Sequence, residues 1–232
     1  MITFESVAVR AESTPGAPDV TILAGVDLHL VERRVAVVGA NGSGKSTLAR
    51  LVNGLVLPTD GRVLVDGLDT ARDGAAIRRR VGFVFTDPDA QLVMPTPRED
   101  VALSLRRLTL DAAERAERVH GVLARFGLAA HAEVSVHALS GGQKQLLALA
   151  GVLATEPAIL VCDEPTTLLD LRWRRVVDEL LDSLDQQVVL VTHDLDAAAR
   201  ADRVLVVDGG RIVADGDAWG AIETYRDRMA VR

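Results

Sequence analysis

The segment Gly39–Ser46, which reads Gly-Ala-Asn-Gly-Ser-Gly-Lys-Ser, constrains the fold more than any other part of the chain. It fits the pattern G-x-x-x-x-G-K-[ST], in which glycines let the backbone wrap closely around phosphate groups. The apolar run 35–38 predicts a buried strand before the loop, and the segment from 47 onward predicts a helix whose N-terminus adds partial positive charge. Because strand, loop and helix are in register, a glycine-rich turn with an incidental lysine is disfavoured. The loop is predicted to bind a nucleoside triphosphate.

Two side chains of this loop have specific predicted roles. Lys45 can reach the β- and γ-phosphates and is a predicted catalytic residue, and the Ser46 hydroxyl can ligate Mg²⁺. The predicted nucleotide contacts of the loop are Gly39, Asn41, Gly42, Ser43, Gly44, Lys45, Ser46 and Thr47.

The apolar segment 158–162 is followed by two acids, Asp163 and Glu164. Burying a carboxylate at a strand end is costly unless it meets a cation. Asp163 is therefore predicted to hold Mg²⁺, directly or through water. Glu164 is predicted to polarise the attacking water as a general base. A strand end running into a solvated turn would give the same pattern, but the phosphate loop elsewhere in the chain favours the metal site.

A second glycine-containing helix start is predicted at 139–144, which reads Leu-Ser-Gly-Gly-Gln-Lys. Ser140 is a good N-cap residue, and the two glycines after it leave backbone N–H groups open to a ligand. An ordinary capped helix after a glycine turn is the alternative interpretation.

Outside these motifs, apolar segments rich in Val, Ile and Leu alternate with helical patterns, as in an α/β fold. Hydrophobic residues make up 48% of the chain but aromatic residues only 3%, so the core must be aliphatic, which suits a parallel sheet buried by helices on both faces. We expect one domain over 1–232, with an α/β core of 1–85 and 156–232 and a helical lobe over about 86–155. The expected strands are 2–9, 20–30, 34–38, 62–65, 81–85, 158–162, 187–191, 203–207 and 211–214; the expected helices are about 45–55, 97–107, 111–126, 142–155, 172–185, 194–200 and 217–228.

Local signals predict some of the boundaries. Asp111, with Glu114 three positions later, is typical of a capping box at a helix start, and Gly127 is expected to end that helix. Proline and glycine at 15–18 predict a turn between the first two strands.

The bulk composition excludes some classes of function. The formal net charge is −7, whereas a nucleic-acid-binding protein normally shows a basic face, so nucleic-acid partners are disfavoured. Cys162 is the single cysteine, so no internal disulfide can form, and a redox role for it is not expected. No apolar stretch approaches the length that spans a bilayer, which predicts a soluble or peripheral protein.

The segment 139–143 resembles the signature motif of the ABC ATPases, and it stands between the phosphate loop and Asp163 in that family's order. Thr167-Leu-Leu-Asp170 looks like the family's D-loop, and His193, after the strand 187–191, looks like its switch histidine. The resemblance runs from about residue 2 to 215. It implies a P-loop core with a mixed sheet and helices on both faces, an antiparallel β subdomain and an inserted helical lobe.

The same resemblance implies ATP and Mg²⁺ as ligands and a head-to-tail dimer. Each ATP would lie between the phosphate loop of one subunit and the signature motif of its partner, so the implied contacts are Ser140, Gly141, Gly142 and Gln143. By this resemblance Glu164 acts as the general base in ATP hydrolysis, and His193 positions the γ-phosphate. Asp170 would link the two sites across the interface.

Two positions depart from the family's pattern. Relatives usually carry a glutamine where this chain has Thr86, and that glutamine contacts Mg²⁺ and the lytic water. Thr86 is shorter, although its hydroxyl could act through water, so we expect a lower ATPase rate than in typical relatives. Relatives often place an aromatic residue against adenine where this chain has Ala11, so nucleotide affinity and base selectivity should be modest; Arg10 could stack there instead.

The segment 86–96 looks like the P-D-x-Q stretch of ATPases from energy-coupling-factor uptake systems, and 140–150 with 165–172 is similar to the biotin-system ATPase. Such systems imply a transmembrane coupling subunit, a substrate-binding membrane subunit and a peripheral position on the cytoplasmic face of the membrane. Biotin ranks first as the transported substrate, ahead of cobalt or nickel. Residues 86–105 are expected either to seat a helix of the membrane protein or to belong to the lobe's own core.

Other ATPases of the family fit less well. Clamp proteins of DNA repair insert a long coiled coil between the phosphate loop and the signature motif, and the segment between Lys45 and Ser140 is too short for one. Translation factors usually carry two such domains with a basic linker, and a kinase or GTPase would leave the signature motif unexplained.

Overall fold

The computed structural model of the chain describes residues 1–11 and 19–230. These residues divide into two compact units. The first unit consists of Met1–Val81, Ile159–Asp163 and Asp185–Arg232, and the second of Gly82–Ala158 and Glu164–Leu184. The helical lobe predicted over 86–155 lies inside the second unit, while the turn predicted at 15–18 lies outside the described residues.

The larger sheet of the first unit has strands in the order β10-β9-β3-β8-β7. Its strands are β3 (Arg34–Val38), β7 (Ile159–Asp163), β8 (Gln187–Val191), β9 (Arg203–Asp208) and β10 (Arg211–Gly216). Pairing is parallel from β9 through β3 and β8 to β7, and β10 is antiparallel to β9. Successive side chains of a strand point to opposite faces, and every residue of 35–38 and 159–163 is buried. Both faces of this sheet are therefore covered at β3 and β7.

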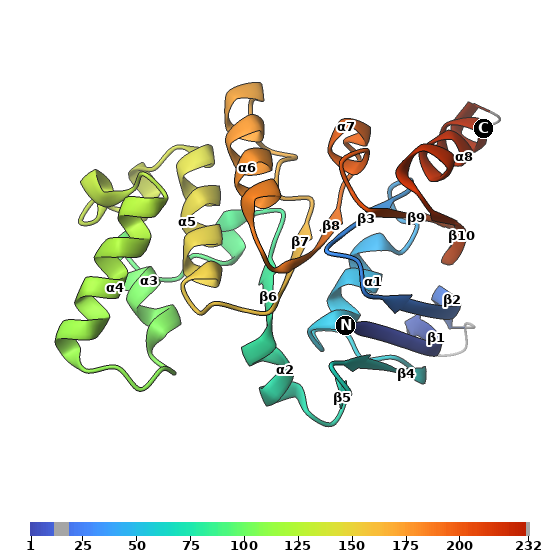
Figure 1. Cartoon of the computed structure of the whole chain (residues 1–232), viewed down its shortest axis with the longest axis horizontal. Coiled ribbons are helices and arrows are strands. Elements are labelled where there is room, and N and C mark those ends of the chain that lie inside the picture. The colour runs from blue at the N-terminus through green and yellow to red at the C-terminus, as the bar shows by residue number, and fades with distance from the viewer. Residues whose placement is uncertain (12–18, 231–232) are drawn as a thin grey trace. The chain divides into compact units, whose positions relative to one another are not determined.

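Three helices cover this sheet (Figure 1). Helix α1 (Lys45–Val52) packs against β7 and β8, α7 (Leu195–Ala198) against β3, and α8 (Ala218–Ala230) against β9 and β10. The core between α7, α8 and the sheet is aliphatic, as the composition predicts. Its buried members are Ala36, Val38, Ala198, Val204, Val206, Ala221 and Ile222.

A smaller antiparallel sheet in the first unit has the order β2-β1-β4-β5. Its strands are β1 (Ile2–Ala11), β2 (Val20–Leu30), β4 (Asp60–Val65) and β5 (Leu68–Asp69). Phe4 pairs with Leu28 on one side and with Val63 on the other, and all three are buried. The short helix α2 (Gly74–Arg80) follows this sheet, and its last three residues, the arginine run, are exposed.

The second unit is mainly helical (Figure 1). After β6 (Val81–Val84) it contains α3 (Pro97–Leu105), α4 (Ala112–Arg125), α5 (Gly141–Leu153) and α6 (Leu171–Ser183), with single 3₁₀ turns at Pro88–Ala90, Ala129–His131 and Val136–Ala138. The capping box predicted at the start of α4 is confirmed. Glu114 N–H donates to Asp111 Oδ1 at 2.9 Å, and Asp111 N–H donates to Glu114 Oε2 at 2.8 Å. Gly127 follows the helix with a φ of 69°, as expected of the residue that ends it.

Among residues 1–11 and 19–230, no helix combines the length and the apolar character that crossing a membrane requires.

Candidate nucleotide site

The predicted site segments of the first unit leave the same edge of the larger sheet. The phosphate loop follows β3, Asp163 ends β7, and His193 comes two residues after β8. In the parallel register, Val191 of β8 lies opposite Val37 and Asp163, and Thr192 N–H donates to the Val37 carbonyl at 3.1 Å. Ligands of open α/β sheets bind outside the carboxyl ends of the strands. The topology therefore brings these three segments to the place where such a ligand lies.

The glycines at the two ends of the phosphate loop are required by its backbone. Gly39 has a φ of 155°, and a Cβ there would lie 2.1 Å from the Val207 carbonyl oxygen. Gly44 has a φ of 107°, and a Cβ there would lie 2.8 Å from Leu23 Cδ2. A side chain at either position would collide with its neighbours and strain the backbone. The loop shape that the motif predicts is thus built into the structure.

Within the loop, polar groups are held close to the backbone. Lys45 is 5% exposed, and its Nζ donates to the Ala40 carbonyl at 2.9 Å. Ser43 Oγ is buried and has no hydrogen-bond partner among the described residues. Asn41 and Gly42 are exposed, and the first N–H groups of α1 have no partner within the helix. A buried cation, an unpaired hydroxyl and open N–H groups together fit an anionic ligand such as a phosphate chain.

The two predicted Mg²⁺ ligands lie side by side although 117 positions separate them in the sequence. Ser46 Oγ donates to Asp163 Oδ1 at 2.8 Å. The other carboxylate oxygen, Oδ2, pairs with Arg50 Nη2 at 3.3 Å. Sequence reasoning missed Arg50. The available signal was its spacing, because residues four apart lie on one face of a helix and Arg50 follows Ser46 by four.

The chemistry of these side chains fits Mg²⁺. Magnesium prefers oxygen ligands and usually takes only one or two from the protein, completing its shell with water and substrate phosphates. Ser46 and Asp163 supply such oxygens. Among the described residues no group of three His, Cys, Asp or Glu side chains could hold a metal by itself. Phosphate oxygens would have to complete the shell.

Glu164 directly follows Asp163 and has a φ of 51°, which is strained for a residue with a side chain. Its Oε2 accepts a hydrogen bond of 2.9 Å from Thr167 Oγ1, a contact that sequence reasoning missed. Strained backbone of this kind concentrates at functional sites. The role of Glu164 as general base stays a prediction.

His193 is exposed, and the residues on both sides of it are held by hydrogen bonds. Asp194 N–H donates to Thr192 Oγ1 at 3.0 Å, and Asp194 Oδ1 accepts from the N–H groups of Asp196 and Ala197 at 2.9 and 3.2 Å. The backbone on both sides of His193 is thereby fixed. Its contact with a γ-phosphate stays a prediction.

The signature-like segment lies in the second unit, at the start of α5. Ser140 and Gln143 form a capping box: Gln143 N–H donates to Ser140 Oγ at 3.3 Å, and Ser140 N–H donates to Gln143 Oε1 at 2.9 Å. Ser140 and Gly141 are exposed. Gly142 is buried, and a Cβ there would lie 2.1 Å from Trp173 Cδ2. Gly142 is therefore required by packing, a role that the sequence interpretation missed.

The remaining predicted residues of the second unit are engaged locally. Asp170 caps α6, where its Oδ1 accepts from Trp173 N–H at 3.0 Å. Thr86 is half-buried. Close to it in sequence, Gln91 accepts from Phe85 N–H at 3.2 Å and donates to the Ala148 carbonyl at 3.4 Å. Gln91 thus links the segment after β6 to helix α5.

An open cavity of about 500 Å³ lies in the second unit, lined in part by Leu92, Val93 and Met94. Val93 is 68% exposed. Part of the apolar surface predicted at 86–105 therefore faces solvent and not the core of the lobe.

The predicted adenine position lies at the end of β1, where Ala11 pairs with Val20. Arg10, the alternative stacking residue, pairs with Asp60 at 3.0 Å. Cys162 is fully buried in β7, where desolvation and then the charge of Asp163 raise the pKa of its thiol well above the usual range. The thiol stays protonated, which argues against a redox role.

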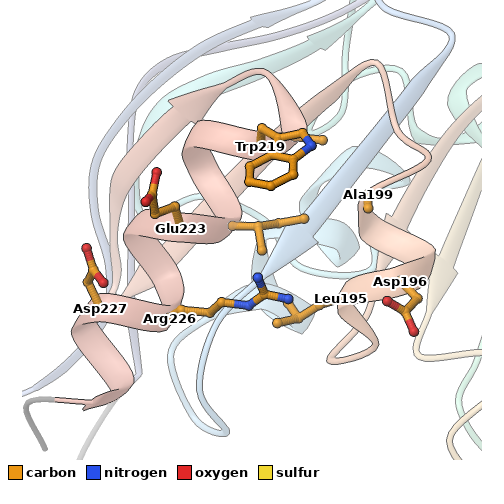
Figure 2. Close-up of a pocket in the computed structure, with 9 residues that line it drawn as sticks. Leu195, Asp196, Ala199, Trp219, Glu223, Arg226 and Asp227 are labelled. Carbon is orange, nitrogen blue, oxygen red and sulfur yellow. The ribbon is translucent and has the colours of Figure 1, made fainter.

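A further cavity of about 370 Å³ lies between α7 and α8 and contains none of the predicted site residues. Figure 2 shows Trp219 and Arg226 on α8 opposite Leu195 of α7 and opposite Ala199, which directly follows α7. The residues that line this cavity differ from those of the phosphate loop. Trp219 is 82% exposed, and Arg226 has no hydrogen-bond or ion-pair partner among the described residues.

The fold and the loop together define a nucleotide-binding α/β protein of the P-loop type. The chain belongs to the ABC transporter family, whose model matches residues 23–167, and it is an ATP-binding subunit of an ABC or energy-coupling-factor transporter. It is 45% identical to the biotin transport ATP-binding protein BioM of Rhizobium etli over 229 residues, covering 99% of each chain. It is 48% identical to an energy-coupling factor transporter ATP-binding protein of Symbiobacterium thermophilum, covering 88% of this chain and 73% of that one.

Among solved structures, the chain is similar to an ATP-binding cassette described as a dimeric post-hydrolysis state bound to ADP and Pi. The TM-score is 0.83 at 30% identity, covering 94% of this chain and 99% of the other. The predicted fold class and the predicted family are thus confirmed.

Proposed function

We propose that the chain hydrolyses ATP to ADP and phosphate, and that it does so as a dimer that drives uptake of a vitamin, biotin in the first place, through separate membrane subunits. The observation that carries the ATPase proposal is the Ser46–Asp163 contact at the foot of the phosphate loop. This contact supports the proposal because it brings together two candidate metal ligands from distant parts of the sequence.

The roles of the residues follow from their positions. The backbone N–H groups and Lys45 hold the phosphates, and Lys45 offsets the negative charge that develops on them during transfer. Ser46 and Asp163 would hold Mg²⁺, which would supply positive charge that offsets the charge of the phosphates. Glu164 orients the attacking water and accepts its proton, and His193 donates to the γ-phosphate. Thr86 takes the place of the usual glutamine and acts through water.

The signature-like helix start completes the site from a second subunit. Its exposed Ser140 and Gly141 can offer a hydroxyl and N–H groups to a nucleotide held by a partner's phosphate loop. The dimer described for the similar solved cassette supports this arrangement. Asp170, at the start of α6, is proposed to link the two sites across the interface.

The proposed partners are a second ATPase, identical or related, a transmembrane coupling subunit and a substrate-binding membrane subunit. The 500 Å³ cavity beside Leu92, Val93 and Met94 is the proposed seat for a helix of the coupling subunit. Its exposed apolar lining is typical of interfaces. The chain would then be a peripheral subunit at the cytoplasmic face of the membrane.

The name of the similar BioM protein supports biotin as the transported substrate, with cobalt or nickel as the second candidate. Co-purification from detergent-extracted membranes tests this. Recovery of a small coupling protein with a substrate-binding membrane protein that carries biotin would support the proposal. If that membrane protein carries a metal ion, cobalt or nickel takes the place of biotin as the proposed substrate. If conventional permease subunits are recovered in its place, the energy-coupling-factor assignment is wrong.

The variant Glu164→Gln tests the mechanism. It removes the proposed base but keeps its size, so turnover should fall at least about a hundredfold, the contribution of a positioned base, while ATP stays bound and the dimer accumulates. Steady-state phosphate release and size-exclusion chromatography with ATP measure the two effects. Thr167→Val is the matched control, because it removes only the hydrogen bond to Glu164 and should cost far less. Undiminished hydrolysis in Glu164→Gln would refute the assignment.

A further inference from the structure

Arg50 contacts the proposed metal ligand Asp163, and the proposed mechanism gives it no role. Arg50 Nη2 lies 3.3 Å from Asp163 Oδ2, while Ser46 Oγ donates to the other oxygen at 2.8 Å. Both side chains come from the same face of α1, because they are four residues apart. A single carboxylate thus has a metal-ligating hydroxyl on one oxygen and a guanidinium on the other.

The burial of Asp163 makes this guanidinium important. The Asp163 side chain is only 2% exposed, and a carboxylate at that depth is unstable unless a cation or several hydrogen bonds offset its charge. Among the contacts of Asp163, Ser46 contributes a neutral hydrogen bond and Arg50 contributes a positive charge. A Mg²⁺ ion at the same carboxylate would also supply positive charge, and two cations within a few ångströms repel each other. The guanidinium and the metal therefore compete for Asp163.

The guanidinium of Arg50 is held loosely enough to move away. Its side chain is 43% exposed, its contact with Asp163 is the single ion pair it makes among the described residues, and its buried Nε has no hydrogen-bond partner there. Arg203 in the same unit is the contrasting case. It bonds to both oxygens of Asp215, at 2.6 and 2.7 Å, and to Glu32 at 3.0 Å, with 20% of its side chain exposed. The single ion pair of Arg50 can break without disturbing other contacts. The several hydrogen bonds that the planar guanidinium of Arg203 makes would have to break together.

We propose that Arg50 is the exchangeable counter-ion of Asp163. It keeps the carboxylate paired and oriented whenever Mg²⁺ is not bound, and it withdraws toward solvent when the metal arrives with the nucleotide. This inference rests on the proposed function, because it requires Asp163 to face Mg²⁺. Arg50 is thus a positioning residue, and its competition lowers the affinity of the site for Mg²⁺ and favours metal release after hydrolysis.

The test compares Arg50→Gln with Arg203→Gln in the full chain, in a Glu164→Gln background so that ATP persists. Thermal unfolding is measured without nucleotide or metal and with saturating ATP and Mg²⁺, and Mg²⁺ is titrated at saturating ATP. Without ligands, Arg50→Gln should melt about 2–4 °C lower, and this deficit should close with ATP and Mg²⁺. Its apparent Mg²⁺ affinity should rise on the order of fivefold. Arg203→Gln should lose stability equally under both conditions and leave the Mg²⁺ affinity unchanged.

Arg50→Lys keeps the charge but not the planar fork, so both of its effects should lie between those of the parent and of Arg50→Gln. An Arg50→Gln deficit of the same size with and without ATP and Mg²⁺ would overturn the proposal, and so would an unchanged or weaker Mg²⁺ affinity. The Glu164→Gln parent and Asp163→Asn separate the two proposals. If Mg²⁺ stabilises the parent with ATP but not Asp163→Asn, the metal site stands and only the role of Arg50 is being tested. If Mg²⁺ does not stabilise the parent, both proposals fail.

Discussion

The two glycine-rich helix starts of the chain, Gly39–Ser46 in the first unit and Ser140–Gln143 in the second, are built differently. In the first, glycines permit a backbone that other residues could not adopt, and a buried lysine lies against the loop. In the second, a capping box fixes an ordinary helix start, and Lys144 in its first turn is bound to Asp89 at 2.7 and 3.0 Å.

The difference shows what each segment can do. The phosphate loop has a buried cation, the proposed pair of Mg²⁺ ligands beside it and a backbone shaped by glycines, so we expect it to bind a triphosphate by itself. The start of α5 offers a hydroxyl and N–H groups, and its lysine is already engaged. Such a segment fits a nucleotide already held elsewhere, which supports a composite site between two subunits.

The most direct test of this difference is to add the same methyl group, as a glycine-to-alanine substitution, to each of the two segments. Gly39→Ala should lower the free energy of unfolding by about 3 kcal/mol, because its Cβ would meet the Val207 carbonyl at 2.1 Å and its φ is unfavourable. Gly141→Ala should change it by less than about 0.5 kcal/mol, because a Cβ there has nothing within 4 Å. Urea denaturation of both variants measures the difference. Equal losses would mean that the glycines of the loop are not structurally required.

A smaller effect distinguishes the two glycines of the second segment. Gly142→Ala should cost about 2 kcal/mol, because its Cβ would enter the ring of Trp173, which must shift. Trp173→Leu makes room, so the double variant should lose less than the sum of the single variants. Denaturation of the four proteins gives the coupling energy, expected at about 1 kcal/mol. Strict additivity would show that the packing of Gly142 against Trp173 is not the reason for the glycine.

Capping boxes start both α4 and α5, which provides a matched pair for the role of Ser140. Ser140→Ala and Asp111→Ala should each cost about 1 kcal/mol, the usual loss of an N-cap. Only Ser140→Ala should also weaken the ATP-induced dimer, measured by analytical ultracentrifugation in the Glu164→Gln background. A dimer weakened equally by Asp111→Ala would show that general destabilisation, and not contact with the nucleotide, is responsible.

Much of the fold could be predicted because strong local signals marked it. The bounds of β2, β3 and β8 agree with the strands expected from their aliphatic runs, and the capping residues Asp111 and Ser140 mark helix starts. The prediction missed β5 and gave no bounds for α2. Strand β5 has only two residues, and α2 ends in an arginine run with Ile77 as its single buried residue. Elements this short carry too little hydrophobic periodicity to be recognised.

In the candidate site, the sequence predicted residues whose chemistry is local and missed those whose role depends on distant partners. Ser46 and Asp163 could be predicted to meet because Asp163 ends one strand of a parallel sheet and the phosphate loop that leads to Ser46 follows another. The spacing of Arg50 places it on the helix face of Ser46, but its pairing with Asp163 depends on contacts between elements that spacing does not reveal. The packing of Trp173 against Gly142 depends on such contacts as well. Thr167 likewise showed no sign of its bond to Glu164.

The smallest expected effect concerns Thr86. Thr86→Gln restores the amide that relatives of this family usually carry, and we expect it to raise the ATPase rate about threefold, or about 0.6 kcal/mol of barrier. Gln91 is the control, because it is the nearby glutamine that could have taken over this role. Its amide is bound to the backbone of Phe85 and Ala148, so Gln91→Ala should lower stability but leave the rate per folded protein largely unchanged. Steady-state turnover of both variants, corrected for the folded fraction, decides between the two residues. A rate that Thr86→Gln does not raise, together with turnover lost in Gln91→Ala, would transfer the role to Gln91 and show that position 86 needs no amide.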